Sequence, residues 1–245
     1  MASARPPNHR RFVLALLALA AGAAHGADES PWKLTAGEYL FSGGGLPADR
    51  GLDLNLRRTS AAGNLWLGWY RQPGADISQW RTGWDRTFET GAVRIQPSVQ
   101  LASGGFRGGS LYLETGRDWF AGAGLGRTNL RPYVNLNFDP NDAITLAAGR
   151  RWGEAEAVTL LLVADNRQNP DQRHLHLNWR SSLAGQERLT LDLLAKRGTV
   201  DGRRIARLGM SATYDWPRWF VRAAWDPKVN FTTQDMLRLA AGARF

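Results

Sequence analysis

Apolar and polar residues alternate along most of the chain after residue 30, and no other feature limits the fold as strongly. Leu52, Leu54 and Leu56 are separated by the polar residues Asp53 and Asn55. The same period recurs in later segments, at 93–101, 133–138, 174–180, 188–193 and 237–245. A period of two places neighbouring side chains on opposite faces of a β-strand. The alternation therefore predicts an all-β protein of many antiparallel strands, separated by turns rich in glycine, proline and asparagine.

The composition excludes several classes of protein. The 245 residues include no cysteine, which excludes disulfide scaffolds, iron–sulfur clusters, thiolate metal sites and cysteine nucleophiles. Only four histidines are present, and two of them fall in the expected leader, so we predict no metal site and no cofactor. No run of 18 apolar residues follows residue 25, and we therefore expect no transmembrane helix.

The N-terminal part has the organisation of a secretory signal peptide. Three arginines precede an apolar stretch at 12–21, and small residues suit cleavage after Gly26. An amphipathic surface helix is the alternative, but the stretch is apolar on all sides. We predict a signal peptide at 1–26 and one domain at 27–245. Because export is expected, the net charge of +9 does not argue for nucleic acid, and no nucleic-acid partner is predicted.

A sheet with one apolar and one polar face suits two settings. In a soluble sandwich the apolar faces meet in a core, whereas in an outer-membrane barrel they meet lipid and the polar faces line the lumen. The polar face here is rich in arginine, asparagine and glycine, as a crowded lumen would be. Indoles can form girdles at the membrane interfaces, and tryptophans lie at or near expected strand ends at Trp32, Trp80, Trp119, Trp152, Trp216, Trp219 and Trp225. These features favour a single antiparallel transmembrane β-barrel.

The C-terminal segment supports the barrel by resemblance. Residues 237–245 alternate apolar side chains with Arg238, Ala240, Gly242 and Arg244, and finish on Phe245. This segment resembles the terminal strand of bacterial outer-membrane β-barrel proteins, a porin-like class, and it indicates no narrower family. The resemblance implies that Phe245 serves in targeting and is read by the barrel-assembly machinery. It also implies a location in the outer membrane of a Gram-negative cell, in contact with lipid and lipopolysaccharide.

The order of short turns and long loops predicts the number of strands. Fifteen candidate strands can be drawn, but an even number is needed to bring both ends of the barrel to the periplasmic side. Joining 118–126 and 130–138 into one long strand, with a β-bulge near 127–129, gives fourteen. Twelve strands are the alternative, if two weak strands merge or are absent. A repeat favours fourteen, because 133–140 and 220–227 are alike and each precedes a Leu-Ala-Ala-Gly motif.

The alternation places more arginines than acidic residues on the inner face. The candidate residues of the lumen and of anion binding are Arg57, Arg94, Arg131, Arg151, Arg180 and Arg222, and Arg81 and Arg238 fall on the same face. Guanidinium groups bind carboxylates and phosphates, and rings of arginine favour the passage of anions. The inner face therefore predicts a small anion-preferring channel, with small anionic solutes as partners. The alternative is a plugged barrel with a structural, assembly or adhesion role, in which arginines pair with inward acids.

One expected strand also carries a candidate enzymatic set. Its inward face holds His174, His176, Asn178 and Ser182. Some outer-membrane barrels use such residues to hydrolyse lipid, but alternate residues of a strand are about 6.6 Å apart, too far for a base to reach its nucleophile. No Gly-x-Ser-x-Gly element occurs. We therefore predict no catalytic residue, and an enzyme acting on outer-membrane lipid is the weaker alternative.

Overall fold

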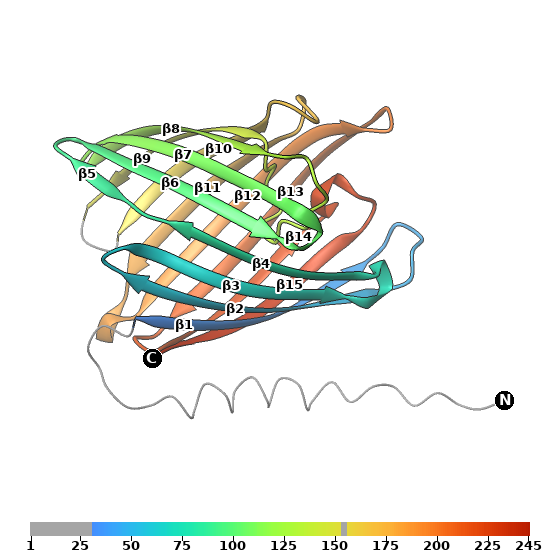
Figure 1. Cartoon of the computed structure of the whole chain (residues 1–245), viewed down its shortest axis with the longest axis horizontal. Helices are drawn as coiled ribbons and strands as arrows, with labels where there is room; N and C mark the ends of the chain where they lie inside the picture. Colours follow the sequence, from blue (N-terminus) through green and yellow to red (C-terminus); the bar gives the residue numbers. More distant parts are fainter. Residues whose placement is uncertain (1–30, 153–155) are drawn as a thin grey trace.

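The computed structural model describes residues 31–152 and 156–245, so the predicted signal peptide at 1–26 lies outside the described residues. The described chain is all-β, as the alternation predicts (Figure 1). The strands are β1 (Trp32–Ser42), β2 (Asp49–Ser60), β3 (Gly63–Gln72), β4 (Ile77–Asp85), β5 (Phe88–Thr90), β6 (Val93–Ala102), β7 (Phe106–Gly116), β8 (Trp119–Thr128), β9 (Ala143–Arg151), β10 (Ala157–Asp165), β11 (Arg173–Ser182), β12 (Arg188–Val200), β13 (Arg203–Asp215), β14 (Trp219–Asp226) and β15 (Asp235–Arg244). Within these ranges, no helix combines the length and the apolar character needed to cross a membrane.

The strands form one closed antiparallel ring. Hydrogen-bonded neighbours run from β4 through β3, β2 and β1 to β15, and then in descending order to β6. β1 pairs with β15 from Lys33 opposite Arg244 to Ser42 opposite Asp235, and β4 pairs with β6 to close the ring. Each strand of the ring therefore has a neighbour on both sides, and the sheet has no open edge at which another chain could pair.

The short strand β5 continues β4 and adds no strand to the ring. β4 pairs with β6 as far as Asp85, and β5 resumes in the same register with Phe88 opposite Ile95. Between them, the Arg86 N–H donates to the Pro97 carbonyl at 3.3 Å, but Pro97 has no N–H to return the bond. The break is local, and the ring has fourteen strands. The prediction of fourteen strands is confirmed, and the alternative of twelve is wrong.

The two ends of the barrel differ. β1 begins and β15 ends at the same end, which also carries short turns such as 61–62 and 117–118. The longer connections lie at the opposite end, at 43–48, 129–142, 166–172 and 227–234. Outer-membrane barrels have short periplasmic turns and longer extracellular loops. We therefore assign the end with the short turns to the periplasm.

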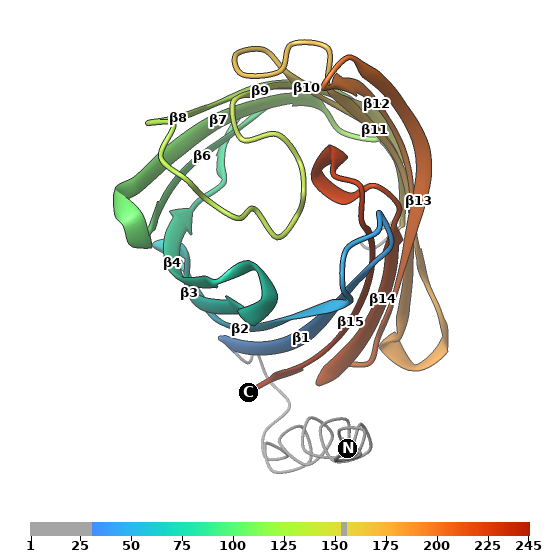
Figure 2. The same cartoon turned by 90° about the vertical axis from the view of Figure 1, so that its right-hand side faces the viewer.

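The predicted strand at 130–138 does not form. β8 ends at Thr128 and β9 begins at Ala143, and the residues between them fold back into the interior of the barrel (Figure 2). We call this stretch, residues 129–142, the crossing segment. The prediction of one long strand with a β-bulge near 127–129 is therefore wrong. The number of strands is still fourteen, because removing the candidate strand 130–138 from the fifteen gives the same number as joining it to 118–126.

The crossing segment alternates in sequence although it is not a strand. Leu136 and Phe138 are 3% and 7% exposed and belong to the apolar cluster inside the barrel. Asn135 and Asn137 line internal cavities. An extended segment inside a lumen meets an apolar surface on one side and water on the other, just as a strand of the wall meets lipid and lumen. A period of two therefore cannot distinguish the two cases.

An apolar cluster lies inside the barrel and joins the crossing segment to the wall. Its buried members are Tyr39 and Phe41 of β1, Tyr70 of β3, Met236 of β15, Leu136 and Phe138 of the crossing segment, and Val229 of the β14–β15 connection. The ring of Tyr39 meets Tyr70 edge-on at 5.6 Å and Phe138 at 5.9 Å between centroids. Aromatic pairs of this kind contribute about 0.5–1.5 kcal/mol beyond the burial of their area. The barrel thus keeps this core in its lumen.

The outer wall of the barrel is apolar. Leucines are exposed on it over most of the ring, among them Leu54, Leu67, Leu111, Leu146, Leu177, Leu193 and Leu239. Exposed tryptophans occur toward both ends, with Trp32, Trp119, Trp152 and Trp219 near the periplasmic end and Trp80 and Trp225 toward the other. Apolar belts flanked by aromatic residues are typical of membrane barrels. The exterior therefore belongs in lipid.

An arginine placed on the outer wall should destabilise the barrel. Leu239 is 45% exposed on β15, next to the inward Arg238. We expect Leu239→Arg to lower the free energy of unfolding by about 2–4 kcal/mol, because a cation near the middle of the lipid face is poorly solvated. Urea unfolding in lipid vesicles, followed by heat-dependent gel mobility, measures the change. Leu239→Met is the control, and equal stability of both variants would contradict the assigned faces.

Candidate permeation site inside the barrel

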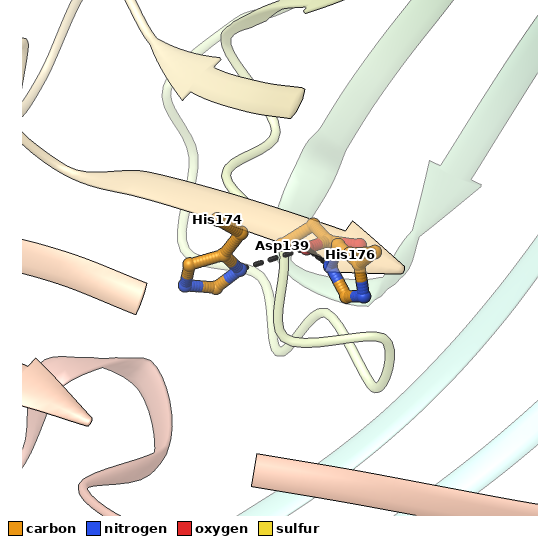
Figure 3. A group of neighbouring side chains, drawn as sticks. All are labelled: Asp139, His174 and His176. Atoms are coloured by element: carbon orange, nitrogen blue, oxygen red, sulfur yellow. Dashed lines mark hydrogen bonds and ion pairs between the residues drawn. The ribbon is translucent and has the colours of Figure 1, made fainter. Parts of the chain in front are cut away.

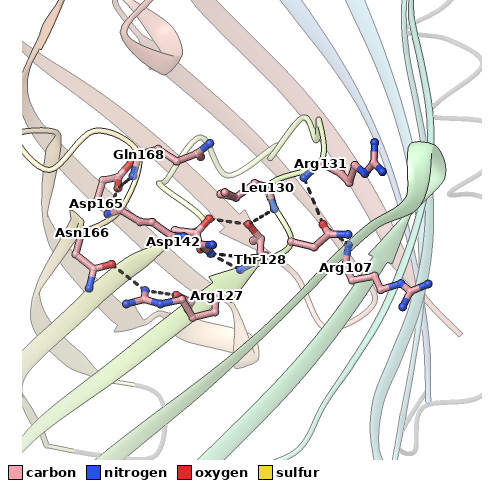
Figure 4. A network of polar contacts seen from close by, with 12 residues as sticks. Arg107, Arg127, Thr128, Leu130, Arg131, Asp142, Asp165, Asn166 and Gln168 are labelled. Atoms are coloured by element: carbon pink, nitrogen blue, oxygen red, sulfur yellow. Dashed lines mark hydrogen bonds and ion pairs between the residues drawn. The ribbon is translucent and has the colours of Figure 1, made fainter.

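One buried carboxylate fixes both ends of the crossing segment. Asp142 is 1% exposed and accepts hydrogen bonds from the Thr128 backbone N–H at 3.0 Å and from its hydroxyl at 2.6 Å (Figure 4). Arg167 donates to Asp142 at 3.1 Å and to the Thr128 carbonyl at 3.0 Å. Asn129 exchanges hydrogen bonds of 3.0 and 3.1 Å with the backbone of Arg107 on β7. The segment therefore leaves and rejoins the wall at fixed points.

Gln79 of β4 holds the middle of the crossing segment. Its amide nitrogen donates to the Val134 carbonyl at 3.0 Å, and its amide oxygen accepts from the Val134 N–H at 2.9 Å. Gln79 is 5% exposed, so both bonds are shielded from water. Beside this contact, the ring of Tyr133 stacks on Phe106 of β7 at 4.1 Å between centroids. Each hydrogen bond contributes about 1 kcal/mol net, and losing one partner would leave a buried group unsatisfied.

Asp139 ties the segment to the strand β11. Its Oδ1 lies 2.8 Å from His174 Nδ1 and 3.2 Å from His176 Nε2 (Figure 3). His176 Nδ1 in turn lies 3.0 Å from Asp192 Oδ2 on β12. Burial raises the pKa of Asp139, but hydrogen bonds from the two histidines outweigh burial and lower that pKa to about 2. Asp139 therefore carries a negative charge near neutral pH.

The two main attachment points lie on opposite sides of the ring. β4, with Gln79, and β11, with His174 and His176, are separated by β6–β10 on one side. On the other side they are separated by β12–β15 and β1–β3. The crossing segment therefore contacts two walls that face each other across the lumen, and the view along the barrel shows it folded into the interior (Figure 2).

A cavity of about 550 Å³ lies between the crossing segment and strands β6–β10, and we call it the neutral cavity. Its polar lining is mostly uncharged, with Gln96, Ser98, Gln100, Ser110, Tyr112 and Thr145. A Cβ at Gly122 would lie 2.2 Å from the Tyr112 hydroxyl oxygen, so glycine at that position makes room for the tyrosine. This wall therefore offers hydroxyl and amide groups to a solute, and little charge.

A second cavity, of about 340 Å³, lies on the other side of the crossing segment, and we call it the basic cavity. Its charged lining residues are Lys33, Asp53, Arg57, Arg81, Arg222 and Arg238. Arg81 binds Asp53 at 2.6 Å, which neutralises that carboxylate. Arg222 donates to the Thr213 hydroxyl at 2.9 Å. Within the described part of the chain, neither Arg222 nor Arg238 forms an ion pair with an acid, so the cavity has an excess of positive charge.

Comparison with solved structures identifies the fold. The Acinetobacter baumannii outer membrane protein Omp33 matches with a TM-score of 0.55 and 10% identity, over 90% of this chain and 100% of that chain. The chain has the fold of an outer-membrane β-barrel. The KdgM porin (TM-score 0.48, 11% identity, 87% and 99% of the two chains) and the NanC porin (0.45, 9%, 86% and 100%) are also similar. No protein-family model and no curated sequence matches.

The fold of an outer-membrane barrel agrees with the protein class that residues 237–245 resemble.

The barrel brings four of the predicted lumen arginines together in two pairs. Arg57 and Arg222 line the basic cavity. Arg94 and Arg151 both bind Glu114, at 3.2 and 2.8 Å, toward the periplasmic end. The second pair is therefore engaged by one shared carboxylate, whereas in the first pair Arg57 lies 3.8 Å from Asp85 Oδ1 and Arg222 forms no ion pair among the described residues.

The other predicted site residues lie apart from these pairs. Arg131 is exposed in the crossing segment, so its predicted place on a strand is wrong. Arg180 lies on β11 and is half-buried. Phe245 exchanges two backbone hydrogen bonds of 3.0 Å with Trp32, which extends the pairing of β15 with β1 by one residue. The role of Phe245 in targeting stays a prediction.

Sequence reasoning missed Gln79 and Asp142, which hold the crossing segment, and also Lys33 and Asp139. Lys33 lines the basic cavity. Its inward position could have been predicted from the alternation, because its neighbours Trp32 and Leu34 are apolar and face outward. Asp139 carried no such signal, because an Asp-Pro pair at 139–140 is typical of a turn on the surface. Its contact with β11 depends on the path of the crossing segment through the lumen.

The candidate enzymatic residues do not come together in the barrel. Ser182 lines a cavity at the periplasmic end with Glu187 and Arg244. His176 and Asn178 line a different cavity, deeper in the barrel. Both ring nitrogens of His176 already contact carboxylates, and neither contacts a hydroxyl among the described residues. The weaker alternative, a lipid hydrolase, therefore lacks a paired nucleophile and base at these positions.

Loss of the Gln79 amide should loosen the crossing segment. We expect Gln79→Leu to raise the hydrogen-exchange rate of the Val134 amide by about tenfold or more, because two buried hydrogen bonds of about 1 kcal/mol each are lost. Mass spectrometry of the detergent-solubilised barrel measures the exchange. Gln96→Leu, in the neutral cavity, is the matched control. The same exchange at Val134 in both variants would mean that Gln79 does not hold the segment.

Proposed function

We propose that this barrel is an outer-membrane channel that prefers small anions. The basic cavity carries the proposal, because Lys33, Arg57, Arg222 and Arg238 line it and its one carboxylate is bound by Arg81. Guanidinium groups form paired hydrogen bonds with carboxylates and phosphates. Small solutes that bear these groups are therefore the proposed partners.

The surroundings of these charges favour selection of anions. Fixed charges in a narrow lumen with a low-dielectric wall focus the electric field and raise the local concentration of counter-ions. Arginines that line a pore favour anions by this mechanism. The crossing segment confines the lumen, so a solute on the basic side passes close to Arg222 and Arg238. On the other side, the neutral cavity offers a route of different chemistry, lined by hydroxyl and amide groups.

A plugged barrel with a structural or adhesion role is the second candidate. It is favoured by the crossing segment, which is tied to β4 and β11 and buries Leu136 and Phe138 inside the lumen. Ion pairs such as Arg81 with Asp53 also tighten the interior. Single-channel recording in planar bilayers distinguishes the two candidates, because a plugged barrel conducts no steady current.

Neutralising the basic cavity should shift selectivity toward cations. We expect the double variant Arg222→Gln/Arg238→Gln to move the reversal potential in a KCl gradient toward that of potassium, because two fixed positive charges leave the lumen. The shift should be larger in about 0.1 M salt than in 1 M salt, where the Debye length falls from about 10 Å to about 3 Å.

Arg150→Gln is the control for this measurement. Arg150 lies on the outer wall, 5.3 Å from the ring centroid of Trp119, and does not line the basic cavity. Its replacement should leave the reversal potential unchanged. A conducting, folded double variant with the selectivity of the original protein would contradict the anion proposal.

We propose that the barrel-assembly machinery recognises Phe245. This machinery would insert the barrel into the outer membrane, where it contacts lipid and lipopolysaccharide. Phe245 is 43% exposed, so its removal takes little packing from the barrel. We expect deletion of Phe245 to reduce the amount of folded barrel in the outer membrane of growing cells. Refolding into detergent should change little, because the deletion removes only the terminal pair of backbone hydrogen bonds with Trp32 and leaves the pairing of β15 with β1, from Lys33 opposite Arg244 to Ser42 opposite Asp235, intact. Equal loss in both measurements would mean that Phe245 acts through stability and not through recognition.

A further inference from the structure

Asp139, His174 and His176 converge as the ligands of a metal ion do, and we call these three residues the His–Asp cluster. Their donor atoms all lie within 4.8 Å of one another. Asp139 Oδ1 is 2.8 Å from His174 Nδ1 and 3.2 Å from His176 Nε2 (Figure 3). In a tetrahedral site with bonds of about 2.0–2.1 Å, donor atoms lie about 3.3 Å apart. Small movements of these side chains would therefore admit an ion.

The surroundings of the cluster hold both rings in place. His176 Nδ1 contacts Asp192 Oδ2 at 3.0 Å, which leaves Nε2 directed at Asp139. A carboxylate on the second ring nitrogen is the usual support of a metal-bound histidine. The ring of His174 is 1% exposed and stacks on Phe231, with centroids 5.4 Å apart and planes inclined by 24°. Each ring already directs one nitrogen at Asp139 Oδ1.

The charge around the cluster suits a divalent cation. Asp139 and Asp192 bring two negative charges to the two histidines. Lys196 lies opposite His174 in the pairing of β11 with β12, but it is ion-paired with Asp226 and so adds no net charge. Asp139, His176 and Asp192 line a cavity of about 260 Å³, through which an ion could reach the cluster from the lumen, and Asp226, Arg222 and Arg238 line the same cavity.

We propose that the His–Asp cluster binds one divalent transition-metal ion, with Zn²⁺ as the representative. Two imidazoles and one carboxylate are ligands of Zn²⁺, Ni²⁺ and Cu²⁺, whereas Mg²⁺ and Ca²⁺ prefer sites built from oxygen alone. Water from the cavity would complete a four-coordinate site. Because Asp139 belongs to the crossing segment and both histidines belong to β11, the ion would fasten the segment to the wall.

Calorimetric titration of the untagged mature barrel with Zn²⁺ in detergent tests this site. Two of the four histidines in the sequence, at positions 9 and 25, fall in the predicted signal peptide, so the mature chain offers one pair. We expect one Zn²⁺ per barrel, and affinity about 100-fold lower or worse in His176→Ala. Asp139→Asn should show a similar loss and alters no strand. Asn178→Ala, on the same face of β11, should bind as the original protein does.

A second variant and a spectrum separate coordination from hydrogen bonding. Asp192→Asn should weaken Zn²⁺ binding by about 10–100-fold, because Asp192 supports His176 without being a ligand. Co²⁺ should give the visible absorption of a tetrahedral site in the original protein and not in His176→Ala. No Zn²⁺ binding by the folded barrel, or equal binding in Asp139→Asn, would overturn the proposal. These measurements do not depend on ion conduction through the barrel. Their outcome is therefore independent of whether the barrel prefers anions.

Discussion

Backbone hydrogen bonding in a medium without water is the constraint on which the rest of this structure depends. An unpaired N–H or C=O group in lipid costs several kcal/mol, so the sheet has to close on itself. β1 pairs with β15 and β4 pairs with β6, and no edge remains. Where Pro97 interrupts the ladder, the break is confined to Arg86 and Thr87, and the register continues. Because the outside of the closed sheet meets lipid, its outward residues have to be apolar. The alternation then places the polar residues, including the arginines, toward the lumen.

A ring of fourteen strands encloses more space than its own side chains fill, and here the crossing segment occupies part of it. Gln79 holds the segment on one wall, and His174 and His176 hold it on the opposite wall. Leu136 and Phe138 are buried where they meet the wall. The neutral cavity and the basic cavity lie on either side of the segment, and the basic cavity carries the proposed preference for anions.

The strands of the wall could be predicted from the sequence, because each strand has one face toward lipid and one toward the lumen and its own residues alternate accordingly. Leu237 and Leu239 face lipid for the same local reason that places Arg57 and Arg222 inside. The crossing segment could not be predicted, since Leu136 and its neighbours alternate with the same period in the lumen as they would in the wall. The meeting of Asp139 with His174 joins positions 35 residues apart across the lumen, and no local pattern encodes such a contact.

The position of the crossing segment is tested most directly by single-channel conductance after the segment is shortened. A short Gly-Ser link in place of residues 131–140 keeps the tie between Thr128 and Asp142 and leaves every strand intact. A larger conductance than that of the original barrel is expected, because the segment then no longer occupies the lumen. An unchanged conductance in a folded, closed barrel would contradict a segment that crosses the lumen.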